Sequence, residues 1–219
     1  MNWSVIERYL PLYEKATLLT LEIGWLGVFL SIALGLLVAM IVHYRVPVLR
    51  QIAKVYIELF RNTPLLIQLF FIYFGLPKVG ISFSPEVCGV MGLGLLGGSY
   101  MAETFRSGIE AVDKIQYETA LSLGMSKTQV MFHVVLPQAV TYSTPAFVAN
   151  IIFLLKETSV FSAISLMDLM FTAKDLIGLY YKTAECLTML VVFYLLILLP
   201  VSIIGSIVER RLSYASFGD

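Results

Sequence analysis

Long apolar runs alternate with short polar segments along the chain. A membrane-spanning helix needs about 20 mostly apolar residues, and several stretches meet this requirement. They lie at roughly 18–42, 53–76, 87–109, 138–165 and 184–208. The segment 166–183 mixes apolar residues with Asp168 and Lys174, which is typical of an interfacial or re-entrant helix rather than a further span. The pattern predicts an all-α integral membrane protein with five transmembrane helices, in which residues 1–219 form a single domain.

The composition supports a membrane protein. The chain is 58% hydrophobic with a mean hydropathy of +0.85, and only 14% of its residues are charged, fewer than a soluble domain of this length carries. Its formal charge is zero, so we expect no nucleic acid partner. Cys88, Cys186, His43 and His133 are isolated, without metal-ligand spacing, so we expect no metal site.

Basic residues are more frequent on one side of the predicted spans. The connection at 44–54, the segment 106–136 and the C-terminal tail hold more Lys and Arg than the loops of the other side. Cytoplasmic loops carry such an excess. We therefore predict an N-terminus outside the cell, a C-terminus in the cytoplasm, and a cytoplasmic loop at 111–137.

A helix–break–helix pattern occupies residues 117–137 of this loop. Gly124 is placed to end a first helix in a left-handed conformation. Ser126 and Gln129 have the spacing of a capping box, so a second helix should start there. Pro137 is tolerated in the first turn of the long helix that follows. Spacing alone also allows an amphipathic helix that rests on the membrane surface.

The same residues resemble a known motif. Glu118-x-Ala120, Gly124 and, after nine residues, Val134-x-Leu136-Pro137 resemble the EAA loop of ABC-importer permeases, with Thr119 where the family usually has a second alanine. The resemblance implies a type I importer permease fold, whose coupling helix docks on a separate ATPase subunit. ATP and Mg would then be bound by that partner, and no cofactor by this chain. The implied coupling residues are Glu118, Thr119, Ala120, Gly124 and Met125.

Asn62-Thr63-Pro64 interrupts the second apolar run near its middle. Proline breaks the hydrogen-bond ladder of a helix, so we expect Thr63 to cap a new half-helix that starts at Pro64. The freed amides would form a positive helix end suited to a carboxylate. A simple packing kink is the alternative.

Ionisable residues lie within or near the predicted spans, where they cost several kcal/mol unless paired or hydrated. Such residues tend to line pathways, but ion pairs that fix helix contacts explain them equally well. Glu58 and Arg61 have the spacing of such a pair, and Arg106 is placed to extend to the cytoplasmic surface. The residues concerned are Glu22, Glu58, Arg61, Glu103, Lys156 and Glu157.

A second resemblance covers most of residues 55–165. The segments ELFRNTPLLIQLFFIYFGLP at 58–77, SYMAETFRSGI at 99–109 and LLKETS at 154–159 resemble polar amino acid permeases of the ABC class. Carried over by position, it implies a substrate pathway lined by Asn62, Thr63, Glu103, Lys156, Glu157 and Ser159. Thr63 would take a substrate carboxylate, and Glu103 or Glu157 an amino group. Family members often have aspartate at the position of Glu157.

Gly92, Gly94 and Gly97 match GxGxxG, but no strand precedes them and they lie inside a span, so they do not indicate a nucleotide site. Gly94 and Gly98 also have GxxxG spacing, which predicts close helix packing. The chain contains no GxxxxGK[ST] and no nucleophile–base arrangement, so we predict no P-loop and no catalytic residue.

Together these observations predict the permease subunit of a bacterial inner-membrane importer. Five spans are few for a pore, so a second permease copy or a homologous permease is expected. The resemblance also implies two ATPase copies, an extracytoplasmic substrate-binding protein and the lipid bilayer as partners. An ATP-independent carrier or channel is the alternative, and a membrane enzyme would need a polar catalytic cluster. Cationic, acidic, amide and sulfur amino acids all stay open as substrates.

Overall fold

The computed structural model describes residues 3–44 and 46–217, with side chains described as far as Leu212. The described residues form helices and connecting turns and no strand, so the all-α prediction is confirmed. The α-helices are α1 (Trp3–His43), α2 (Leu49–Arg61), α3 (Leu65–Phe70), α4 (Pro85–Glu110), α5 (Lys114–Ser122), α6 (Lys127–Val130), α7 (Leu136–Glu157), α8 (Leu169–Tyr180) and α9 (Thr183–Phe217). Shorter π and 3₁₀ turns are η1 (Phe71–Gly75), η2 (Leu76–Val79), η3 (Met131–Val135) and η4 (Thr158–Ile164).

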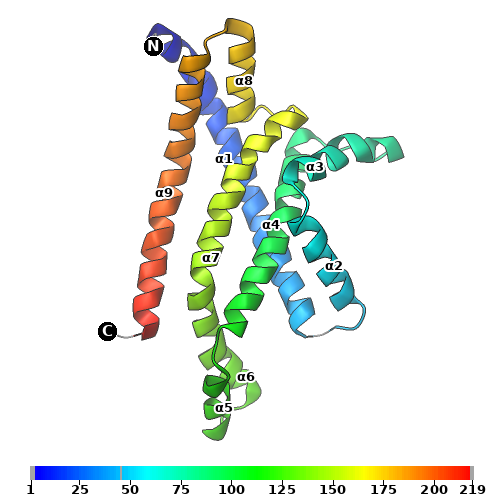
Figure 1. Ribbon diagram of the computed structural model, residues 1–219, viewed down its shortest axis with the longest axis vertical. Coiled ribbons are helices and arrows are strands. Elements are labelled where there is room, and N and C mark those ends of the chain that lie inside the picture. Colours follow the sequence, from blue (N-terminus) through cyan, green and yellow to red (C-terminus); the bar gives the residue numbers. More distant parts are fainter. Residues whose placement is uncertain (1–2, 45, 218–219) are drawn as a thin grey trace.

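Four long helices, α1, α4, α7 and α9, run along the long axis of the molecule (Figure 1). The start of α1 and the end of α9 lie at opposite ends of this bundle, and α5 and α6 project beyond it at the end where α9 finishes. Within the described residues, three helices are long and apolar enough to cross a membrane: Trp3–His43, Lys127–Ile164 and Thr183–Leu212. The bent pair of Leu49–Arg61 and Leu65–Val79 makes a fourth if it counts as one span.

Helix α4 is not among these apolar helices, although its bounds agree with the predicted span at 87–109. Its glycine-rich centre lowers its hydropathy and at the same time lets it occupy the middle of the bundle. The prediction of five spans therefore stays a prediction. The helix α1 begins at Trp3, well before the expected start at residue 18, because Tyr9 and Tyr13 pack in an apolar cluster with α8 and α9.

Small residues allow α1 and α4 to pack closely along their length. A Cβ atom added at Gly94 would lie 2.6 Å from Cγ of Leu30, and one added at Gly97 would lie 2.7 Å from Cβ of Ser31. The hydroxyl of Ser31 donates a hydrogen bond of 3.0 Å to the carbonyl of Leu93 across the same contact. The close helix packing predicted from the glycine spacing is thus observed.

The second predicted span is broken. Helix α2 and the helical segment Leu65–Val79 meet at an angle of 107°, so the break expected at Asn62–Pro64 is present but the chain does not continue as a straight helix (Figure 1). The expected cap is wrong. The α3 helix starts after Pro64 without a side-chain cap, and the hydroxyl of Thr63 instead donates a 2.7 Å hydrogen bond to the Leu59 carbonyl.

Gln68 donates hydrogen bonds to backbone carbonyls at the end of α2. The Nε2 of Gln68 donates hydrogen bonds of 3.1 Å and 2.9 Å to the carbonyls of Phe60 and Thr63. Carbonyls at the end of a helix lack partners within that helix, and Gln68, which is buried, supplies them from the next turn of chain. The bend is therefore fixed by the α3 side chain that folds back on it.

The hydroxyl of Tyr13 ties α1 to the start of α9 by donating a 2.8 Å hydrogen bond to the Cys186 carbonyl, and the Tyr13 side chain is fully buried. We expect Tyr13→Phe to lower the stability by about 1 kcal/mol, because a buried hydrogen bond is lost without a large change in shape. The midpoint of thermal unfolding in detergent should fall by roughly 2–4 °C. Tyr44→Phe, at an exposed position, is the matched control and should leave the midpoint unchanged. An unchanged midpoint in Tyr13→Phe would contradict this assignment.

Candidate functional site

A cavity of about 320 Å³ lies at the break between α2 and α3. One part of its wall is polar and charged, with Arg61, Asn62 and Thr63 from the break and Glu157 from the end of α7. The rest of the lining is mainly apolar and comes from α3, α4, α7 and η4. A cation and an anion therefore line one small cavity, which suits a compact ligand that carries both charges.

The interruption of the helix between α2 and α3 determines which groups face this cavity. The Nδ2 of Asn62 donates hydrogen bonds to the carbonyl and a carboxylate oxygen of Glu58, at 2.7 Å and 3.3 Å. This contact turns the Asn62 side chain back along α2. Among the described residues Glu157 forms no salt bridge, so its half-buried carboxylate is available to an incoming cation.

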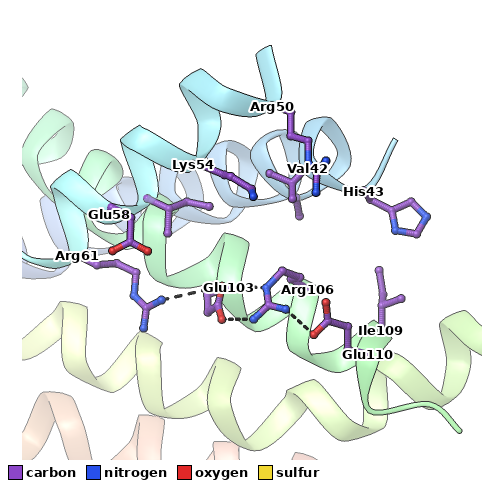
Figure 2. A pocket seen from close by; sticks show the side chains of 12 residues that line it. Val42, His43, Arg50, Lys54, Glu58, Arg61, Glu103, Arg106, Ile109 and Glu110 are labelled. Atoms are coloured by element: carbon purple, nitrogen blue, oxygen red, sulfur yellow. Dashed lines mark hydrogen bonds and ion pairs between the residues drawn. The ribbon is translucent and has the colours of Figure 1, made fainter. Parts of the chain in front are cut away.

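A larger cavity of about 600 Å³ lies between α2, α4 and the end of α1; we call it the vestibule. Figure 2 shows its charged side chains on two facing helices, with Arg50, Lys54, Glu58 and Arg61 on α2 and Glu103, Arg106 and Glu110 on α4. Arg106 bonds to the two α4 carboxylates that line the vestibule: its Nε donates to Oε2 of Glu103 at 3.1 Å, its NH2 group donates to Oε1 of Glu103, and its NH1 group pairs with Glu110.

The structure divides the predicted pathway residues among three places. Asn62, Thr63 and Glu157 meet in the smaller cavity, whereas Glu103 lines the vestibule. Lys156 and Ser159 line a third cavity of about 360 Å³ toward α8 and α9, so they are not brought together with the others. The helical turn of α7 explains the split, because successive residues of a helix point in different directions.

Two arginines were missed as site residues. The expected pair of Glu58 with Arg61 is absent among the recorded salt bridges of the described chain, and Arg61 instead approaches Glu103 on another helix. Sequence spacing cannot reveal such a contact, because it depends on how α2 packs on α4. The partners of Arg106 lie three and four residues away on its own helix, and that spacing was a usable signal. Arg106 is thus paired on its own helix, and its extension to the cytoplasmic surface stays a prediction.

The segment of α5 and α6 forms a second candidate site. Gly124 has a φ of 85°, as expected for a left-handed helix end. The capping box is confirmed: the Gln129 amide donates to Oγ of Ser126 at 3.3 Å, and the Ser126 amide donates to Oε1 of Gln129 at 2.9 Å. The second helix runs on through the π turn η3 into α7 (Figure 1).

The coupling residues predicted from the resemblance have different surroundings. Ala120 is buried in an apolar cluster that α5 forms with α6, η3 and the start of α7, and Met125 packs against this cluster. Glu118, Thr119 and Gly124 are exposed. The buried residues fix the shape of the segment, and the exposed ones form its outer face.

This outer face also carries apolar side chains. Leu123 is 79% exposed and Ile115 is 66% exposed. Exposed large apolar groups on a segment outside the bundle are typical of a protein interface. The sequence analysis did not single out these residues, because burial cannot be read from residue type alone.

The fold and the two sites define a membrane permease: a helical bundle with charged cavities between its helices and an exposed helical segment at one end. The family model described as "Binding-protein-dependent transport system inner membrane component" matches residues 31–214. The chain belongs to this family, and the resemblance to ABC-importer permeases is confirmed.

Relatives of known name cover nearly the whole chain. A probable amino-acid permease protein YxeN of Bacillus subtilis (strain 168) is 33% identical over 216 residues, which is 97% of this chain and 96% of the relative. A putative glutamine transport system permease protein GlnP of Rickettsia typhi (strain ATCC VR-144 / Wilmington) is 36% identical over 200 residues, which is 90% of this chain and 91% of the relative.

Solved structures agree with this assignment. A chain from the crystal structure of an amino acid ABC transporter with histidines is 33% identical, with a TM-score of 0.90 over 96% of this chain and 99% of that chain. The MetNI methionine ABC transporter in an inward-facing conformation gives a TM-score of 0.77 at 19% identity over 94% of this chain and 98% of that chain. The second likeness concerns the fold, and it confirms the type I importer permease architecture.

Proposed function

We propose that this chain forms the substrate pathway of an ATP-binding cassette importer for a polar amino acid. The observation that carries the proposal is the cavity of about 320 Å³ with Arg61 and Asn62 in its wall and Glu157 beside them. An α-amino acid at neutral pH carries one carboxylate and one ammonium group, and the cavity offers a partner for each. Relatives named as amino-acid and glutamine permeases support this substrate class.

The α5–α6 segment couples this pathway to a separate ATPase subunit, which binds ATP and Mg. Its exposed apolar and acidic groups, Ile115, Glu118 and Leu123, form the docking face. The arrangement has two permease chains, two ATPase subunits below them and a substrate-binding protein outside. The N-terminus lies outside and the C-terminus in the cytoplasm of a bacterial inner membrane, in line with the basic residues of α2 and α4 at the C-terminal end of the bundle.

The mechanism is alternating access. Nucleotide drives the pathway only through contacts that differ between its two states. ATP closes the ATPase dimer and draws the two α5–α6 segments together, and α7, which continues from α6 without a break, transmits the movement to the bundle. Hydrolysis then returns the pathway to the inward state.

The test is uptake by the assembled complex in proteoliposomes that contain ATP. The permease, its ATPase and its binding protein should together accumulate one labelled member of a panel of the twenty amino acids and L-cystine, and uptake should fall to background with a non-hydrolysable ATP analogue. Uptake at an equal rate without ATP would favour the ATP-independent carrier. Uptake of no amino acid would overturn the proposed substrate class.

A further inference from the structure

Arg61 lies between the two cavities. It is the last residue of α2, directly before the break, and it lines both the vestibule and the smaller cavity. Figure 2 shows its guanidinium group reaching from α2 toward Glu103 on α4. A small movement of this one side chain is therefore enough to transfer its charge from one cavity to the other.

The contacts of Arg61 are weak. Its NH1 group lies 3.9 Å from Oε2 of Glu103, which is beyond hydrogen-bond distance. Its guanidinium carbon lies 5.4 Å from the centre of the Tyr100 ring, and its side chain is 37% exposed. A guanidinium has five N–H donors in a planar fork, and the structure records no hydrogen bond from this fork to a described residue.

Glu103 does not depend on Arg61. Both of its carboxylate oxygens already accept hydrogen bonds from Arg106, which also pairs with Glu110. Removal of Arg61 therefore leaves Glu103 and Glu110 paired with Arg106. The cost of releasing Arg61 is small, because the principal partner of Glu103 stays in place.

Arg61 is the one cationic residue among the described residues that line the smaller cavity. Among the described residues that line it, Arg61 carries the positive charge and Glu157 the negative charge. The Thr63 hydroxyl hydrogen is engaged by the Leu59 carbonyl, so the Thr63 side chain has no donor left for a carboxylate. A guanidinium matches a carboxylate with two parallel hydrogen bonds, which are stronger and more selective than those of neutral donors.

We infer that Arg61 binds the carboxylate of the transported amino acid and exchanges Glu103 for this ligand, while Glu157 receives the ammonium group. The inference rests on the proposed function and replaces Thr63 by Arg61 as the carboxylate-binding group. It also has a structural consequence. Substrate binding removes the ion pair that joins α2 to α4 across the vestibule, so the ligand itself loosens one link between the two helices.

The experiment compares an amino acid with its carboxamide. The purified permease–ATPase complex, without binding protein, is assayed for equilibrium binding of the amino acid taken up in proteoliposomes and of the same amino acid with its carboxylate converted to an amide. We expect the wild-type complex to prefer the amino acid by about tenfold or more, because a charged bidentate pair is lost in the amide. Arg61→Gln should weaken binding of the amino acid by about tenfold to a hundredfold and change binding of the amide by less than about threefold.

Two further variants make the result specific. Lys54→Gln removes a positive charge that lines only the vestibule, and it should keep the wild-type preference. Arg61→Lys keeps the charge without the planar fork, and it should show a reduced preference, which also covers the case in which Arg61→Gln does not assemble. If Arg61→Gln or Arg61→Lys keeps the full wild-type preference for the amino acid over its amide, the inference is overturned. ATP-driven uptake by the wild type would still support the proposed function in that case. Loss of wild-type uptake itself would overturn the proposed function.

Discussion

Gly124→Pro is expected to abolish ATP-driven uptake while the helices of the bundle stay folded. Gly124 has a φ of 85°, whereas proline fixes φ near −65°. Its amide donates a 3.0 Å hydrogen bond to the Leu121 carbonyl, and proline has no amide hydrogen to replace it. Both effects change the angle between α5 and α6. The effect should stay local, because a Cβ atom at Gly124 meets no other atom within 4 Å.

The measurement separates coupling from folding. Detergent-solubilised Gly124→Pro should elute as a single species with a near wild-type unfolding midpoint, but it should no longer retain the ATPase subunit during purification. Gly80→Pro is the matched control, because Gly80 also has a φ of 85° and open space around it, but it ends η2 outside the α5–α6 segment. This control should retain the ATPase. Wild-type uptake by Gly124→Pro would refute the coupling role of the segment.

Gly124→Ala is a milder substitution than Gly124→Pro and should have a smaller effect on the turn between α5 and α6. Gly124→Ala costs about 1–2 kcal/mol, because an L-residue in the left-handed conformation brings Cβ close to the following carbonyl. The capping box of Ser126 and Gln129 fixes the start of α6 directly after this turn. If the coupling proposal holds, ATP-driven uptake by Gly124→Ala should lie between that of the wild type and that of Gly124→Pro.

Local features of the fold could be predicted from the sequence. The left-handed Gly124, the capping box at Ser126 and the break near Pro64 each depend on a few adjacent residues. The bounds of α4 and the start of α9 also follow the apolar runs closely. Such features are determined by backbone chemistry, which acts at short range in the chain.

Contacts between distant segments could not be predicted in the same way. The sequence offered Glu58 as the near partner of Arg61, but the packing of α2 on α4 brings Glu103 closer. Thr63 had the chemistry of a cap, but its hydroxyl donates to the Leu59 carbonyl of the preceding helix, and α3 starts without a side-chain cap. Glu58 and Glu103 are chemically equivalent partners for Arg61, and only the arrangement of helices in space decides between them.

The glycines of α4 show that a weak sequence signal can have a large structural effect. The match to GxGxxG has no meaning for nucleotide binding, but Gly97 lies where α1 and α7 both approach α4. Ser31 of α1 and Leu154 of α7 lie on either side of it, and both are fully buried. A side chain at this point would have to push two helices away at once.

Gly97→Leu is accordingly expected to prevent correct folding, and Gly97→Ala to destabilise the bundle by about 1–3 kcal/mol, the usual cost of overpacking. An added Cβ would lie 2.6 Å from Cδ1 of Leu154 and 2.7 Å from Cβ of Ser31. The midpoint of thermal unfolding of Gly97→Ala should fall by roughly 2–4 °C for each kcal/mol. Gly178→Ala is the control, because no atom lies within 4 Å of its added Cβ on α8, and the higher helix propensity of alanine should leave stability equal or raised. If Gly97→Ala unfolds at the wild-type temperature, α1 and α7 can move away from the added methyl group without loss of stability. The close packing of α1 and α7 on α4 would then not stabilise the bundle.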